Sequence, residues 1–492
     1  MRNQMKRLLA NTFKGAGILA IAGFISKILA ALYRFPYQNL VGDQGFYAFQ
    51  QVYPFYSIIT TLSLVALPNF LSSLIHRSDE PELETQQFFQ LSLLLSFASF
   101  VILTIFSQPI AKLMGQEKLA APLVMAISPL LLVPFLSLYR GLLQGRHQMG
   151  KTAVSQIIEQ LFRVVLIILS AASFLKFSPN IYTVSFLAML GSFVGGLCSL
   201  VYLIITTPLQ LKELFTNFFL LAAKLNIIKK FGISSLIFTF FMIYMLLLQM
   251  IDVFFVKHAL MNMSQPMTSN AAEKLKGVYD RGQPFLQLGL VITTSILTDA
   301  LPRLSKKGHI PKKIWHVVIL LSVTITTGLF ILLPTMNDIL FQNHSHALSL
   351  QIFILQIPLI SMIQLYHHAL FLKHKNKASG CILLVGLCLK LLTVYPLTVA
   401  YGILGASLSS LFSLLVVALL YMCYSKIHPL ALLTKRFYVA LLAMSLVLII
   451  GDNSIVVENR LLQLLKVILL SAIAAAVFLK ISKFELKQLK KS

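Results

Sequence analysis

Long apolar runs, each about as long as a membrane crossing, recur along almost the whole chain. Because a helix needs ~20 residues to cross a bilayer, these runs predict fourteen membrane-spanning helices. The predicted spans are 12–36, 46–75, 86–107, 119–141, 152–175, 181–206, 231–256, 278–301, 314–334, 347–372, 378–400, 402–424, 436–451 and 461–481. They leave no room for a soluble domain, so the sequence predicts an all-α polytopic membrane protein.

The charge distribution indicates how the chain sits in the membrane. The formal net charge of +25 would suit a nucleic-acid partner, but most cations lie in short segments between apolar runs. With the N-terminus in the cytoplasm, 28 of the 41 lysines and arginines fall in cytoplasmic segments and 7 in outer loops. This bias follows the positive-inside rule. We therefore expect both termini in the cytoplasm, contact with anionic lipids at that face, and no nucleic acid.

Two polar segments interrupt the pattern of spans. Residues 207–230 mix lysine with apolar residues, which predicts an amphipathic helix on the cytoplasmic surface. This linker follows six spans, so it divides a first lobe, 1–206, from a second lobe, 231–424. The last two spans and a basic tail occupy 425–492. Residues 257–276 form the longest outer loop, and their polar composition predicts a mobile segment.

A short internal echo supports the two lobes. Gly45, Tyr47 and Gln51 recur as Gly277, Tyr279 and Gln283 at an offset of 232 residues. The tripeptides ITT and ALP follow in the same order at offsets of 233 and 234 residues. A shift of six spans keeps the direction of the chain, so the repeats would be parallel. Parallel repeats that flank a midplane site are a transporter architecture.

Two cations inside the first span point to a polar cavity. Lys27 and Arg34 are seven residues apart, close to two helical turns, so both lie on roughly the same side of the helix. A cation at mid-bilayer costs ~2.5–3.5 kcal/mol, and a chain keeps it where it faces protein or a watery cavity. Pro36 ends or bends this helix. The remaining cations inside spans are Arg163, Arg281, Lys390 and Lys466.

Two cations in the second lobe are further candidates for the cavity. Arg281 follows Asp280 at the start of the eighth span, where Gly282 and Pro284 should disturb the helix and leave backbone groups for a ligand or water. The alternative is an anchor at the outer interface. Lys390 lies in the middle of the eleventh span with no carboxylate nearby in the sequence, and a cavity role and a structural role are equally open.

Acidic residues in or near the spans have several interpretations. Asp252 lies in the seventh span with Gln249 on the same face, and it could bind a proton or cation, pair with a cavity cation, or form a structural salt bridge. Asp43 lies just beyond the first span and could cap the second helix or gate the cavity. Glu159 and Arg163 are four residues apart, so a mutual ion pair is their default.

No pattern typical of an enzyme or a metal site occurs. The four cysteines lie in apolar runs without a CxxC spacing, and the paired histidines 344/346 and 367/368 lack carboxylate neighbours. There is also no phosphate-binding glycine loop, nucleophile elbow or metalloprotease motif. We expect a transporter with no catalytic residue, no metal and no cofactor.

Two stretches resemble a known family: GFISKILAALYRFPYQNLVGDQGFYAFQQVYPFYSIITTLSLVALP and GVYDRGQPFLQLGLVITTSILTDALP. They are similar to the polysaccharide-transporter branch of the multidrug/oligosaccharidyl-lipid/polysaccharide flippase superfamily, above all to MurJ-type lipid II flippases and their sporulation relatives. The resemblance implies two six-span lobes in a V, two extra helices that form a lipid-facing groove, and a cycle between inward-open and outward-open states.

The resemblance also implies roles for individual residues. The family's cavity cations correspond here to Lys27, Arg34 and Arg281, and its acid on the seventh span corresponds to Asp252. That acid helps to bind sodium in some members. The other sodium ligands, on the eleventh span, are not evident here, and Lys390 occupies that span instead. Coupling to Na+, to H+ or to the membrane potential therefore stays open.

We expect a flippase in the bacterial plasma membrane that exports an undecaprenyl-diphosphate-linked cell-wall precursor, with lipid II as the first candidate. The alternatives are another lipid-linked glycan, such as a teichoic acid or capsule unit, and a drug or cation antiporter. A membrane glycosyltransferase and a scaffold fit less well, because the outer loops are short and the spans contain buried cations. We expect a monomer, with cell-wall synthesis proteins as partners.

Overall fold

The computed structural model describes residues 23–26, 28–209, 214–216, 221–304, 308–342, 345–455, 457 and 459–491. All regular secondary structure within these ranges is helical. The chain forms two compact units. The first comprises Met1–Met261 with Thr268–Gly277, and the second comprises Asn262–Met267 with Val278–Ser492.

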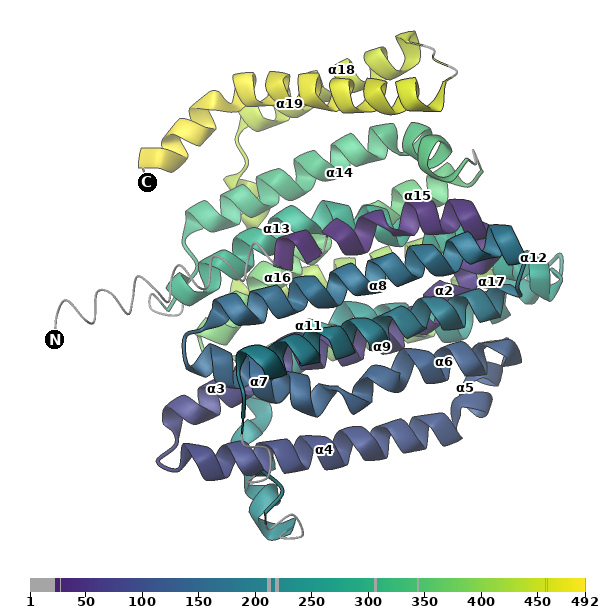
Figure 1. Ribbon diagram of the computed structural model, residues 1–492. Coiled ribbons are helices and arrows are strands. Elements are labelled where there is room, and N and C mark those ends of the chain that lie inside the picture. The colour runs from purple at the N-terminus through teal and green to yellow at the C-terminus, as the bar shows by residue number, and fades with distance from the viewer. Residues whose placement is uncertain are drawn as a thin grey trace. The chain divides into compact units, whose positions relative to one another are not determined.

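The first unit is a bundle in which consecutive helices pack as neighbours, as Figure 1 shows for α8 and α9. Its elements are α2 (Arg34–Thr61), the π-helical turn η1 (Leu62–Ala66), α3 (Leu67–Arg77), α4 (Pro81–Ile105), α5 (Ser107–Leu113), η2 (Glu117–Leu119), α6 (Ala120–Ile127), η3 (Ser128–Leu131), α7 (Val133–Gly145), α8 (Met149–Phe177), α9 (Ile181–Thr206), α11 (Leu221–Met261) and most of α12 (Ser269–Asp280). Leu221–Met261 is interrupted at Gly232, close to the predicted boundary between the amphipathic linker and the seventh span.

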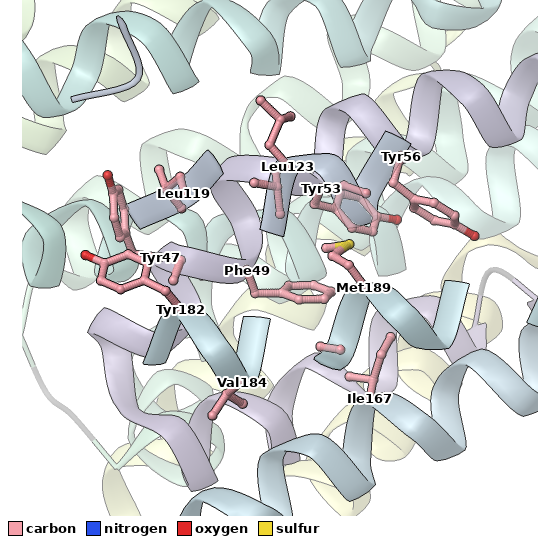
Figure 2. Close-up of a cluster of buried hydrophobic side chains, with 14 of the residues drawn as sticks. Tyr47, Phe49, Tyr53, Tyr56, Leu119, Leu123, Ile167, Tyr182, Val184 and Met189 are labelled. Carbon is pink, nitrogen blue, oxygen red and sulfur yellow. The ribbon is translucent and has the colours of Figure 1, made fainter. Parts of the chain in front are cut away.

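An aromatic core holds the first unit together. Phe49 lies at the centre of this core. The centroid of its ring is 4.9 Å from that of Tyr37, 5.8 Å from that of Tyr53 and 6.1 Å from that of Tyr33. Figure 2 shows that Tyr53 and Tyr56 lie at one end of this cluster, whereas Tyr47 and Tyr182 lie at the other. Arg34 and Arg163 contact Tyr53 at one end of this core, and Lys257 contacts Tyr47 at the other.

The second unit is also helical. Its elements are the end of α12, α13 (Gly282–Leu304), α14 (Lys312–Phe341), α15 (Ala347–Ile354), α16 (Gln356–Leu372), α17 (Asn376–Ser425), η4 (Pro429–Leu432), α18 (Lys435–Ser454) and α19 (Arg460–Lys491). The last two helices form a hairpin that packs on α14 (Figure 1). Within the hairpin, Lys466 of α19 forms an ion pair of 2.8 Å with Asp452 of α18. Asp452 also accepts a hydrogen bond from Thr335 of α14.

The helices confirm a protein that crosses the membrane many times. Eleven helices of the described residues are long and apolar enough to cross it. Gly23–Arg77 (55 residues) and Asn376–Ser425 (50 residues) each hold two predicted spans. Gly42 (φ 71°) and Gly402 (φ 60°) break these two helices at the predicted junctions, because glycine adopts a left-handed φ without steric cost. The total of fourteen crossings stays a prediction.

The predicted outer loop 257–276 is wrong over most of its length. Helix α11 continues to Met261 and α12 begins at Ser269, so only a short connection is non-helical. The prediction failed because Lys257 and Glu273, which look like solvated loop charges, are buried against each other. By packing, α11 belongs to the first unit, whereas the lobe boundaries at 206 and 231 rest on the repeat and stay a prediction.

Candidate functional site

Arg34 is a fully buried cation at the first residue of α2. Its guanidinium carbon lies 4.4 Å from the centre of the Tyr53 ring, which is the geometry of a cation–π contact. None of its three guanidinium nitrogens has a hydrogen-bond partner among the described residues. Because buried polar groups normally have hydrogen-bond partners, the guanidinium of Arg34 marks this position as a candidate site.

Arg163 on α8 lies against the same group of aromatic rings. It donates hydrogen bonds to the Tyr33 hydroxyl at 2.9 Å and to Gln160 Oε1 at 3.0 Å. Its guanidinium carbon lies 4.5 Å from the centre of the Tyr56 ring and 5.6 Å from that of the Tyr53 ring. Arg163 is thus oriented from both sides, by hydrogen bonds and by ring faces.

We name this group the basic–aromatic cluster. Its members are Tyr33, Arg34, Tyr53, Tyr56, Gln160 and Arg163. In the described part of the chain, no carboxylate oxygen lies within 4.0 Å of a side-chain nitrogen of Arg34 or Arg163. Two arginines that share the ring of Tyr53 thus place uncompensated positive charge at one end of the aromatic core.

The predicted ion pair between Glu159 and Arg163 is wrong. Glu159 pairs instead with Arg140 of α7, at 2.6 Å, and both side chains are almost completely buried. Arg140 also donates to the hydroxyls of Ser155 and Ser199, so the Arg140 side chain has partners on α8 and α9. Because Arg140 of α7 is the ion-pair partner of Glu159, the positive charge of Arg163 is not neutralised by Glu159.

Buried charge without a partner is the distinctive electrostatic property of this cluster. A buried ion is costly unless it is paired. Ring faces offset part of that cost, since a desolvated cation–π contact contributes about 2 kcal/mol. An anion with several oxygens would offset more of it through charge-assisted hydrogen bonds. The arrangement is therefore suited to anion binding.

The other predicted residues of the first unit have separate surroundings. Lys27 lies outside the described residues. Asp43 directly follows the helix break at Gly42 and accepts a hydrogen bond from Gln38 at 2.8 Å. Asp252 and Gln249 are both buried on α11.

Arg281 and Lys390 belong to the second unit and contact neutral groups. Arg281 lies between α12 and α13, which confirms the predicted disturbance of the helix at this point. It is buried, donates to Asn337 at 3.3 Å, and lies over the ring of Phe341. Lys390 is fully buried and donates to Ser410 Oγ at 2.5 Å across the break in α17.

The structure thus gives Arg34 a partner that sequence reasoning missed. Arg163 was assigned to an ion pair on its own helix, and Arg140 was counted with a cytoplasmic loop. One signal was present in the sequence: Tyr53 and Tyr56 are three residues apart, so one helix face presents two aromatic rings. Nothing in the sequence indicated that α8 faces these rings.

Known proteins are similar to this chain in sequence and in fold. The polysaccharide biosynthesis protein family matches residues 12–309. The uncharacterized membrane protein YabM of Bacillus subtilis (strain 168) is 33% identical over 422 residues, which cover 82% of this chain and 78% of that protein. The lipid II flippase MurJ of the same organism is 28% identical over 211 residues, which cover 39% of this chain and 38% of that protein.

The similarity in fold extends further than the similarity in sequence. A structure of the lipid II flippase MurJ in an inward closed conformation matches with a TM-score of 0.67, at 13% identity, and covers 94% of this chain and 98% of that one. At this identity the match shows the fold alone. Together with the match over residues 12–309, it confirms the resemblance expected from the sequence. The chain belongs to the polysaccharide biosynthesis protein family and has the fold of MurJ.

Proposed function

We propose that this protein is a flippase that carries a lipid-linked glycan with a diphosphate from the inner to the outer leaflet by alternating access. The observation that carries the proposal is the pair formed by Arg34 and Arg163, which share the ring of Tyr53 and have no carboxylate partner among the described residues. A flippase for an anionic headgroup needs such a pair, whereas a scaffold protein does not.

The chemistry of a diphosphate matches the cluster. Guanidinium groups present planar N–H forks that bind phosphate oxygens in pairs, and such charge-assisted hydrogen bonds are strong. The hydrogen bonds of Tyr33 and Gln160 would fix the orientation of Arg163, while Arg34 keeps all its donors for the ligand. The lipid tail would stay in the bilayer as the headgroup crosses.

Lipid II is the first candidate substrate, because a relative in sequence and a structure of the same fold are both named lipid II flippase. Teichoic acid and capsule precursors carry the same diphosphate chemistry and are the alternatives. Lys27, Arg281 and Lys390 are proposed as further substrate contacts. Asp43, Asp252 and Gln249 are proposed for gating or ion coupling.

The membrane potential is a sufficient energy source for this transport. Moving two negative charges outward across 100 mV releases roughly 4–5 kcal/mol when the cytoplasm is negative. ATP hydrolysis is then not required, and the sequence has no motif for it. Coupling to Na+ or H+ is the alternative source.

A reconstituted system tests the function directly. Purified protein in liposomes receives fluorescent lipid II, a lipid-linked teichoic acid precursor or a cationic dye, and the initial rate of transfer between leaflets or into the lumen is measured. We expect transfer of a lipid-linked glycan, and a loss of about tenfold to hundredfold for Arg34→Ala and for Arg163→Ala. Lys118→Ala is the matched control, because Lys118 is an exposed cation of the same unit.

Full transfer of the lipid-linked substrates by both arginine variants would overturn the proposal. Transport of the dye alone would favour the antiporter. Circular dichroism and gel filtration of each variant establish that a loss of rate does not come from a loss of fold.

A further inference from the structure

A second polar cluster of the first unit surrounds a buried ion pair. Lys257 near the end of α11 and Glu273 on α12 are 2.8 Å apart, and both side chains are fully buried. Lys257 also donates to the carbonyl oxygen of Gly115 at 2.6 Å and lies over the ring of Tyr47. The pair contacts Tyr47 and Tyr182, which lie at the end of the aromatic core opposite to Tyr53 (Figure 2).

The Glu273 carboxylate accepts more hydrogen bonds than the ion pair alone provides. Gln44 and Tyr182 donate to Oε2 at 2.7 and 2.9 Å, and Gln116 donates to Oε1 at 2.8 Å. These donors come from α2, from α9 and from the turn before η2. The Glu273 side chain of α12 is therefore held by donors from α2, α9, α11 and the turn before η2.

The rest of this segment has further close contacts with the first unit, among them Asn270, which accepts a hydrogen bond from Gln44 at 3.4 Å. Gly277 lies so near the backbone of Asp43 that an added Cβ would be 2.0 Å from its carbonyl oxygen. At the N-terminal end of the segment, the connection before α12 is non-helical, and Asn262, Ser264, Gln265 and Pro266 are exposed. The segment 269–277 is thus a short helix between an exposed connection and the helix interruption at Arg281, and its Glu273 carboxylate accepts hydrogen bonds from four side chains of the first unit.

We propose that Glu273 is a releasable latch: its carboxylate holds the segment 269–277 against the first unit, and this segment undocks during transport. We define the latch as Glu273 with its donors Lys257, Gln44, Gln116 and Tyr182. The contacts favour release over permanent anchoring because the bonds to Glu273 and Asn270 join polar groups that can be hydrated again, and the one fully buried apolar side chain of the segment is the small Ala272. Buried ionic groups are known to specify one conformation rather than to add stability over an apolar core.

The first test measures docking without any substrate. In a background in which Cys198, Cys381, Cys388 and Cys423 are replaced by alanine, Ala272→Cys reports on undocking, since Ala272 is completely buried in the docked segment. Lys274→Cys on the same helix is exposed and controls for reagent access. The rate of maleimide labelling is measured for both positions in liposomes.

Loss of the latch should raise the labelling of Ala272→Cys and leave that of Lys274→Cys unchanged. We expect at least about a tenfold rise for Glu273→Gln and a smaller rise for Tyr182→Phe, which removes one donor and keeps the ion pair. The milder variant answers the question if Glu273→Gln does not fold. Unchanged labelling in the folded variants would overturn the proposal.

The second test locks the segment. Gln44 and Asn270 face each other with side-chain atoms 3.4 Å apart, so Gln44→Cys with Asn270→Cys can be bridged by a short, reducible bis-thiosulfonate reagent. We expect the bridge to stop transfer of the lipid-linked substrate and a reducing agent to restore it. Transfer at the original rate in the bridged protein would overturn the latch.

This second test rests on the proposed function, whereas the labelling test does not. If the protein without a bridge moves no substrate, the proposed function fails and the labelling result still decides whether Glu273 holds the segment.

Discussion

Arg140 and Glu159 join α7 to α8 through an ion pair of 2.6 Å, and this pair leaves Arg163 to the tyrosines. The first unit thus contains buried cations of two kinds. Arg140 and Lys257 have a carboxylate partner, whereas Arg34 and Arg163 have none in the described chain. The two kinds should respond differently to mutation, since one contributes to folding and the other is available to an anion.

Removing Arg140 should destabilise the protein. Arg140→Met leaves the Glu159 carboxylate buried without its cation, which is expected to lower the free energy of unfolding by about 3–5 kcal/mol. The double variant Arg140→Met with Glu159→Gln should recover part of this loss, because no lone charge remains buried. Thermal unfolding in detergent measures both. Equal stability of Arg140→Met and the wild type would show that the pair has no structural role.

The ring of Tyr53 should matter more than its hydroxyl. Tyr53→Phe keeps the ring face for both arginines, whereas Tyr53→Leu removes it. Since a buried cation–π contact contributes about 1–2 kcal/mol, we expect transfer rates to fall by roughly fivefold to thirtyfold for the leucine variant. The phenylalanine variant should stay near the wild-type rate. The proteoliposome assay distinguishes the two, and equal rates for Phe and Leu would contradict a role for the ring.

Docking of the segment 269–277 should resist mild acid. Burial alone would raise the pKa of Glu273, but hydrogen bonds from Gln44, Lys257 and Gln116 and the charge of Lys257 lower it below its ordinary value of 4.5. A depressed pKa means that the stabilisation is complete above the pKa of the undocked carboxyl and is lost as the pH falls through the docked value. The labelling rate of Ala272→Cys, divided by that of Lys274→Cys at the same pH to correct for the loss of reactive thiolate in acid, should therefore stay low from about pH 8 to about pH 5 and rise in stronger acid.

A neighbouring histidine provides the control for this titration. His258 lies next to Lys257 in the sequence, and its ring nitrogen is 3.1 Å from the carbonyl oxygen of Leu113. His258→Gln removes this titratable group and should leave the pH profile unchanged. A pH-dependent rise in labelling that disappears in His258→Gln would assign the sensitivity to the histidine instead.

The two glycines at the helix breaks should be intolerant of alanine. Gly42 and Gly402 both have a positive φ, and an added Cβ at either position meets no heavy atom closer than 3.5 Å. Alanine there is strained by its backbone alone, so each variant should lose about 1–2 kcal/mol of unfolding free energy. Gly150, which is helical and has open space around its Cα, is the control, and Gly150→Ala should be neutral or stabilising. Equal melting temperatures for all three variants would contradict the assigned strain.

Sequence patterns predicted the features that depend on neighbours along one helix. The apolar runs gave the helices, and glycine with proline marked the interruption at Arg281. The break at Gly402 lies at the first residue of the predicted span 402–424, although the sequence pattern did not single out this glycine. Spacing along a helix sets which side chains share a face, but it does not determine which other helix meets that face.

The errors all concern contacts between helices. Glu159 has a partner on its own helix at the right spacing, but Arg140 of α7 takes the carboxylate. Lys257 and Glu273 are separated by 16 residues and a non-helical connection, so their mutual burial left no local signal. Arg163 could be assigned to the cluster only once α8 was seen to meet the tyrosines of α2.

Under the proposed function, the charges of Arg34 and Arg163, which share the ring of Tyr53, determine which step of the transport cycle responds to the membrane potential. A vacant site carries two positive charges, while a site filled by a doubly negative diphosphate is close to neutral. A cell interior at negative potential then acts mainly on the return stroke, by drawing the vacant cationic site back toward the cytoplasm. The charge moved per turnover is the same as if the anion itself were driven outward. The step that the voltage accelerates, however, is the return of the vacant site and not the outward movement of the filled one.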